Sequence, residues 1–206
     1  MARFLSIHPV NPQPRLIREA VSILRGGGVV VYPTDTTYAI GCHIGDKQAV
    51  ERVRRIRGKD DKHNFALMCR DLSESGIYAS YSTPMFRLLK AHTPGPYTFI
   101  LQATSEVPRR LMHPKRKQVG LRVPDHILLQ ALLTELGEPI LTSTLKLPGD
   151  EHPMNDPELI FRRLENDVDL VIDGGICGLD PTTLVRMVGV EVEVIRVGVG
   201  DPSDFA

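Results

Sequence analysis

The sequence predicts one α/β domain of the α+β-like kind over residues 1–206, with a twisted sheet of mixed parallel and antiparallel strands and flanking helices. Short apolar runs of β-forming residues alternate with segments of helical periodicity. Several adjacent strands have no room between them for a crossover helix, which argues against a doubly wound parallel sheet. No repeat, linker or low-complexity tract divides the 206 residues, so one core is the economical interpretation.

The first half of the chain alternates strands with two helices. Asn11 is expected to cap the first helix, with Pro12 at its first position, and three glycines at 26–28 end it. Asp46 is expected to cap the second helix, whose exposed faces carry arginines. The strands predicted here span residues 4–7, 29–32, 38–44 and 64–69.

The second half continues the alternation. Thr83 and Pro84 begin a helix, and Asp125 is expected to cap another over 127–136 that a glycine ends. Asp156, followed by a proline, opens a last helix that runs to residue 164. The strands predicted here span residues 97–101, 119–123, 140–145, 170–172, 183–185 and 192–195.

The composition excludes several classes of protein. No apolar run reaches the roughly 18 residues of a membrane helix, and the first ten residues do not look like a signal peptide. We therefore expect a cytoplasmic protein without a membrane partner. The 3 cysteines are scattered and form no CxxC pair, and the 7 histidines form no HxxxH pair, so neither a disulfide framework nor a metal site is predicted.

Charge is unevenly distributed along the chain. The formal net charge is zero, but residues 52–122 hold 15 Lys and Arg against 5 Asp and Glu. Residues 141–206 hold 5 Lys and Arg against 13 Asp and Glu. The basic part is the candidate region for an anionic ligand. The alternative is that folding brings the two parts together and cancels the field.

The usual glycine-rich phosphate motifs are absent, so side-chain cations would have to hold a bound nucleotide. Thr34 and Thr36 follow an apolar strand directly, at the end where α/β proteins place ligands. The alternative there is a hydroxyl-rich turn that satisfies its own backbone. Arg57 and Lys59 close a basic helix, where the alternative is a solvated run of charge.

Polar side chains also interrupt or follow several later strands. Arg122 lies in an apolar strand and needs a partner or a ligand, unless it faces solvent. The other candidates are Thr144, Lys146, Thr182 and Arg196. None of these signals is specific alone.

Taken in order, these segments resemble the YrdC/YciO family, and most closely its YciO branch. The motifs that carry the resemblance are Pro33-Thr34-Asp35-Thr36-Thr37-Tyr38 with Gly41, Pro94-Gly95-Pro96-Tyr97-Thr98, Arg122-Val123-Pro124 and Asp173-Gly174-Gly175. The resemblance implies a YrdC-like fold and a nucleotidyltransferase that makes threonylcarbamoyl-AMP and diphosphate from ATP, L-threonine and bicarbonate. That product serves the modification of adenosine 37 in tRNA.

The resemblance also implies roles for individual residues. Arg57 and Lys59 would be catalytic at the triphosphate of ATP, which enters with Mg²⁺ as a co-substrate; no prosthetic group is implied. Thr144, Lys146 and Arg196 would complete the phosphate site. The residues implied to face the amino acid are Thr34, Thr36, Arg122 and Thr182.

The chain departs from the synthase pattern at four places, one of which is Thr182-Thr183, where the synthases have a Ser-Thr pair. Arg57-Gly58-Lys59 stands where the synthases have Lys-x-Arg, and Thr144-Leu145-Lys146 stands where they have Ser-x-Asn. Met68 aligns with a histidine. These changes keep a cationic site but remove an amide and an imidazole, so we expect the selection of threonine to be the part most altered.

Two alternatives to synthesis stay open. A basic concavity is also expected of a module that binds tRNA or double-stranded RNA, although 5% aromatic residues and no tryptophan give little support for base stacking. The other alternative is hydrolysis or carriage of a small phosphorylated or carbamoylated metabolite. Convergence of Arg57, Lys59, Arg122, Lys146 and Arg196 on one cavity would favour a small anionic or nucleotide ligand.

Overall fold

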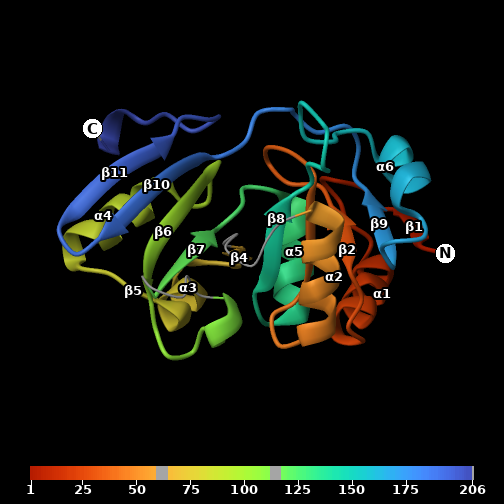
Figure 1. Ribbon diagram of the computed structural model, residues 1–206, viewed down its shortest axis with the longest axis horizontal. Coiled ribbons are helices and arrows are strands. Elements are labelled where there is room, and N and C mark those ends of the chain that lie inside the picture. The colour runs from red at the N-terminus through yellow and green to blue at the C-terminus, as the bar shows by residue number, and fades with distance from the viewer. Residues whose placement is uncertain (59–64, 112–116, 206) are drawn as a thin grey trace.

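A single 11-stranded sheet runs through the protein, and helices cover both of its faces (Figure 1). The computed structural model describes residues 1–58, 65–111 and 117–205. The strand order is β1-β9-β2-β3-β8-β4-β7-β6-β10-β11, and β5 pairs with β6. The strands are β1 (Arg3–Ser6), β2 (Val30–Tyr32), β3 (Ala39–His43), β4 (Ala66–Met68), β5 (Ala79–Ser80), β6 (Tyr97–Ala103), β7 (Gln118–Arg122), β8 (Ile140–Thr144), β9 (Leu170–Asp173), β10 (Thr183–Val188) and β11 (Glu191–Arg196).

The pairing of these strands confirms the mixed sheet. The pairs β1·β9, β2·β9, β4·β7 and β6·β10 are parallel. The pairs β2·β3, β3·β8, β4·β8, β6·β7, β5·β6 and β10·β11 are antiparallel. The antiparallel pairs β2·β3 and β10·β11 join strands by short connections, as the spacing along the sequence required.

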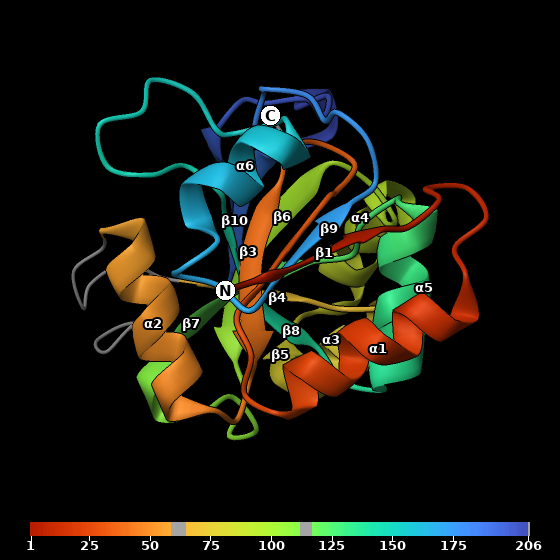
Figure 2. The same cartoon turned by 90° about the vertical axis from the view of Figure 1, so that its right-hand side faces the viewer.

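The helices divide between two apolar clusters that lie on opposite faces of the sheet. They are α1 (Pro14–Arg25), α2 (Lys47–Arg57), α3 (Leu72–Tyr78), α4 (Thr83–His92), α5 (Ile127–Leu136) and α6 (Pro157–Leu164). Figure 2 shows α1 beside α5 on one face and α2 on the other. The alternation of β2 explains the division: Val30 and Tyr32 pack with α1 and α5, whereas Val29 and Val31 pack with the residues of α2.

Several helix ends follow from local chemistry. The Asp46 carboxylate accepts the Ala49 N–H at 2.8 Å and caps α2, and Asp156 caps α6 in the same way. Both caps were predicted. The start of α4 at Thr83 was also predicted.

Two predicted caps are wrong. Helix α1 begins at Pro14, not at Pro12, because the His8 ring holds residues 8–11 in a turn by accepting the N–H groups of Val10 and Asn11. Helix α5 is capped by His126, whose Nδ1 accepts from Leu129 at 3.4 Å. The Asp125 N–H is directed instead to the carboxylate of Asp35.

Helix α3 and strand β5 were not predicted. The signal for α3 lay in Asp71 and Glu74, three residues apart. The Asp71 side chain accepts the Glu74 N–H at 2.8 Å, while the Glu74 carboxylate accepts the Arg70 N–H at 2.7 Å, an arrangement close to a capping box. Of the helices in the described ranges, none is long and apolar enough to cross a membrane.

Candidate functional site

A cavity of about 470 Å³ opens on the central strands, and the predicted cations converge on it. Arg57, Arg122, Lys146 and Arg196 all line it, although they come from α2, β7, the segment after β8 and β11. Thr144 and Thr182 line it as well. Lys59 lies outside the described residues. The convergence that the sequence could only propose is therefore present for four of the five cations.

Small side chains on neighbouring strands leave room for this cavity. Ala39 on β3, Thr142 on β8 and Ala66 on β4 all line it. Ala66 is in register with Thr142 on one side and with Gly120 on the other, so the row across β8, β4 and β7 carries little bulk. Larger residues at these positions would fill the space that a ligand needs.

Arg57 is a buried cation with an unsatisfied nitrogen. It ends α2, and Gly58 follows in the left-handed conformation (φ 59°), with Pro148 so close that a Cβ would come within 2.4 Å of it. The Arg57 Nε donates to Ser143 Oγ at 3.1 Å, but the buried Nη1 has no hydrogen-bond partner among the described residues. Burial lowers the pKa of Arg57 to about 10, against an opposing effect of Asp150. An anion in the cavity would satisfy this guanidinium.

The segment after β8 contributes Lys146 to the same cavity as Arg57, and a lysine side chain is more flexible than that of arginine. Thr144 is half-buried and Lys146 is exposed, so the ammonium group can reach ligands of different size. Glu151, His152 and Asp180 also line the cavity and were not singled out from the sequence. The cavity therefore has a basic wall and carboxylates among its other lining residues.

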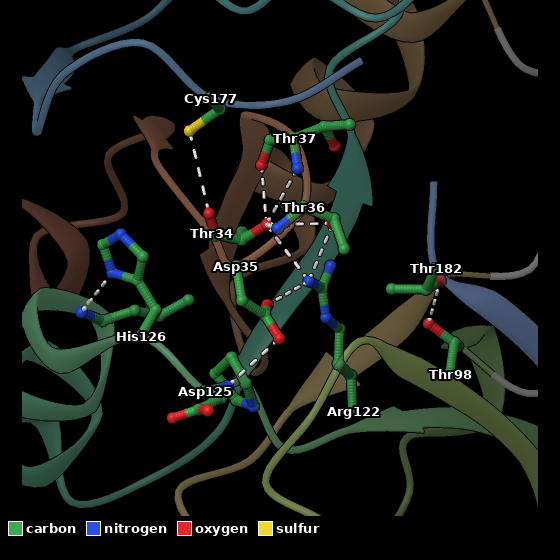
Figure 3. Close-up of polar contacts among 12 residues, drawn as sticks. Thr34, Asp35, Thr36, Thr37, Thr98, Arg122, Asp125, His126, Cys177 and Thr182 are labelled. Carbon is green, nitrogen blue, oxygen red and sulfur yellow. Dashed lines mark hydrogen bonds and ion pairs between the residues drawn. The ribbon is translucent and has the colours of Figure 1, made fainter. Parts of the chain in front are cut away.

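Arg122 is buried and already bonded within the protein (Figure 3). Its Nη2 donates to Thr34 Oγ1 at 3.1 Å, to Thr36 Oγ1 at 2.9 Å and to the Asp35 carboxylate. The other oxygen of Asp35 accepts the Asp125 N–H at 3.2 Å. The partner that a charged residue in an apolar strand requires is thus supplied by the polar turn at 34–36.

This arrangement changes the interpretation of Thr34 and Thr36. Both are buried, neither is among the residues that line the cavity, and their described contacts are within the protein. Their implied role beside the amino acid stays a prediction. Thr34 Oγ1 also donates to the Thr37 carbonyl at 2.7 Å, and the Cys177 thiol lies 3.7 Å from the Thr34 carbonyl. The two hydroxyls accept hydrogen bonds from the Arg122 guanidinium and so fix its position.

Arg196 and Thr182 form the far side of the cavity. The Arg196 guanidinium donates to the Thr182 carbonyl at 3.2 and 2.9 Å, and the Thr182 hydroxyl lies 2.8 Å from that of Thr98. Burial lowers the pKa of Arg196, and the nearby charge of Arg122 lowers it further. Two guanidinium groups therefore lie close enough to repel each other.

Three polar groups that touch this site were given no role from the sequence. Ser143 receives the Arg57 bond, Thr98 pairs with Thr182, and Thr142 on the floor accepts the buried Tyr32 hydroxyl at 2.8 Å. The run of three hydroxyl residues at 142–144 inside a strand was the available signal. Within the described ranges, no group of three or more His, Cys, Asp or Glu residues could hold a metal ion.

Comparisons with known proteins show the family and the fold. The family model named for Sua5, YciO and YrdC, with the description telomere recombination, matches residues 22–198. The chain is 55% identical to YciO of Escherichia coli over the whole length of both chains, and the crystal structure of that protein superimposes with a TM-score of 0.97.

More distant relatives carry a functional name. A threonylcarbamoyl-AMP synthase of Halorhodospira halophila is 29% identical over 86% of this chain and 93% of its own length. The crystal structure of P. abyssi Sua5 complexed with L-threonine has a TM-score of 0.87 at 22% identity, over 96% of this chain and 58% of that one. The latter likeness shows the shared fold.

Proposed function

Because the chain belongs to the Sua5/YciO/YrdC family, we propose that it binds ATP in the cavity and transfers the adenylyl group to a small carbamate. The observation that carries the proposal is the buried Nη1 of Arg57. Within the part of the chain that the structure describes, it has no partner and lies in the wall of a cavity with three further cations. A buried donor of this kind costs free energy unless an acceptor reaches it. Phosphate oxygens are acceptors that arginine binds well.

The proposed reaction has two chemical stages. The amino group of an amino acid takes up bicarbonate and forms a carbamate with loss of water. A carbamate oxygen then attacks the α-phosphorus of ATP, the bond to the β-phosphate oxygen breaks, and diphosphate leaves. No covalent bond to the enzyme is needed, so the role of the protein is to align the reactants and to neutralise charge.

The described residues divide naturally between the two reactants. Arg57 and Lys146 would hold the triphosphate together with Lys59, which lies outside the described residues. Arg196, which donates to Thr182 and lies near Arg122, would meet the phosphate nearest the amino acid. Thr144 lies between them and the amino acid. Mg²⁺ would arrive on the phosphates, as this ion usually does when only one or two carboxylates are near, and Glu151 is a lining carboxylate that would meet it.

At the amino-acid end, Met68 stands where the synthases are expected to carry a histidine. Met68 is fully buried and packs in the cluster with α5. Ala66, two residues earlier on the same face of β4, lines the cavity. Thr98, Thr182 and Arg122 are the polar groups at that end. We therefore expect a weaker preference for threonine than an imidazole contact would provide.

RNA binding is the competing interpretation. A polynucleotide would favour cations spread over an open surface, whereas Arg57 and Arg122 are both less than 10% exposed and line one cavity. The geometry thus favours a small ligand, and an RNA affinity that falls with rising salt would support the other role.

The test is release of diphosphate from ATP with bicarbonate and a panel of amino acids that includes L-threonine. The expected result is release by the native chain and a loss of at least about tenfold in Arg57→Gln. Arg55→Gln is the matched control, because Arg55 is an exposed arginine on the same helix. Equal ATP affinity in the native chain and in Arg57→Gln would remove the basis of the proposal.

A further inference from the structure

Asp35 has a position that none of the roles above uses. Its side chain is only 9% exposed and forms an ion pair with Arg122, whose side chain is 7% exposed. One carboxylate oxygen faces Arg122, and the other accepts the Asp125 N–H next to the start of α5 (Figure 3). The carboxylate is thereby fixed at both ends.

The groups around this pair leave Asp35 as the neutralising charge. Arg196 on β11 adds a second positive charge near Arg122. Burial lowers the pKa of His126 on the α5 side, and burial raises the pKa values of Tyr32 and Cys177, so these three groups are uncharged near neutral pH. The two arginines and Asp35 together carry a net charge of about +1; the carboxylates of Asp125 and Asp180 are exposed, so solvent screens them.

We propose that Asp35 is a positioning residue and a resident counter-ion: it holds Arg122 in the cavity wall and limits how strongly Arg122 attracts a ligand anion. This rests on the proposed function only in taking the cavity to be a site for anions. The ligand would then bind in one orientation, with its most highly charged group at Arg57 and Lys146. A singly charged group, such as one carboxylate, would lie at Arg122.

The Asp35 carboxylate competes with a ligand anion for the Arg122 guanidinium. The Arg122 Nη2 already donates to three acceptors, and the Nε is buried with no partner in the described ranges. Removing the charge of Asp35 leaves a buried guanidinium short of a counter-ion, and a ligand anion can take that place. A multiply charged anion gains the most from the change.

The experiment measures binding of inorganic diphosphate to the full chain by calorimetry. Asp35→Asn is expected to bind diphosphate about tenfold more tightly than the native chain. Asp180→Asn is the matched control: it removes the same charge from an exposed position in the same cavity, and a gain of less than about twofold is expected. The double variant Asp35→Asn with Arg122→Gln is expected to lose the gain.

An unchanged or weaker affinity in Asp35→Asn would overturn the inference, and so would an equal gain in Asp180→Asn. Failure of the proposed function is separate, since it is judged by Arg57→Gln. If Asp35→Asn is poorly stable, its melting temperature is compared in diphosphate and in chloride of equal ionic strength. Diphosphate is expected to raise it more than it raises that of the native chain, and equal rises would count against Asp35 as a counter-ion.

Discussion

Replacing Arg57 with an apolar residue of similar length is expected to stabilise the empty protein while it removes ATP binding. Arg57 is 7% exposed, and no residue that the structure describes accepts a hydrogen bond from its buried Nη1. Such a group is retained at a cost in stability, which a bound anion offsets. Arg57→Met removes the charge and keeps most of the volume.

The magnitude follows from the pKa. Burial lowers the pKa of Arg57 to about 10, and at about 1.36 kcal/mol for each pKa unit the lowering corresponds to about 3 kcal/mol. Solvent in the open cavity screens the charge, so about 2 kcal/mol is the better figure. The lost hydrogen bond to Ser143 offsets about 1 kcal/mol, which leaves a net gain of about 1 kcal/mol for Arg57→Met.

The cost of burying the Arg57 charge depends on pH. Below about pH 10 the guanidinium is protonated in both the folded and the unfolded chain, so the whole cost is present at neutral pH. Above about pH 10 the unfolded chain binds more protons than the folded chain, and stability rises with pH from this group. Arg57→Met removes that contribution.

Thermal unfolding with and without Mg²⁺ and ATP is the assay. A gain of about 1 kcal/mol corresponds to about 2–4 °C for a domain of this size. ATP at about 100 times its dissociation constant is expected to stabilise the native chain by about 2.7 kcal/mol and the variant hardly at all. Arg55→Met, on the exposed face of α2, is expected to stay within about 0.5 kcal/mol. A variant destabilised by more than about 1 kcal/mol, or one that ATP stabilises as strongly as the native chain, would refute the reasoning.

Three further predictions concern other parts of the molecule. Gly41→Ala is expected to destabilise by several kcal/mol in urea unfolding, because its Cβ would lie 2.5 Å from the Leu141 carbonyl oxygen; a loss under about 1 kcal/mol would show that β3 and β8 can separate. His126 has a lowered pKa, so its contribution to stability falls as the pH drops below about 6.5, where the unfolded chain takes up the proton first. His126→Asn should flatten this fall in stability between pH 7 and 5 while still capping α5. An unaltered slope of stability against pH would exclude His126 as the source of the fall. Lys146→Asn should leave the melting temperature within about 1 °C but weaken ATP binding at low salt and reduce its salt dependence, and an unchanged salt slope would place the ammonium away from the phosphates.

Much of the fold was predictable because its signals are local. Asp46 and Asp156 cap helices through bonds that reach only two or three residues along the chain. The alternation of Val29 to Tyr32 assigns each side chain to one face of the sheet without reference to any distant residue. Errors arose where a distant or competing group intervened, as when the His8 ring held the turn before α1.

The candidate site was predictable as a set of residues but not as a network. A cation that interrupts an apolar strand or closes a helix stands out in the sequence, which is why Arg57, Arg122, Lys146 and Arg196 could be selected. The sequence could not show which guanidinium is already neutralised within the protein and which one is left unsatisfied. Nothing in the local sequence distinguishes Arg57 from Arg122 in this respect.

The sequence by itself determined the α/β class, the mixed pairing of strands and the presence of several cations in otherwise apolar surroundings. Only the tertiary structure decided that Arg122 meets Asp35, 87 residues away, and that Arg57 meets Ser143, 86 residues away. The physical reason is that strand order and register bring distant segments together, and charge pairing depends on that proximity. A sequence shows which groups need a partner, and the fold decides which of them is left for a ligand.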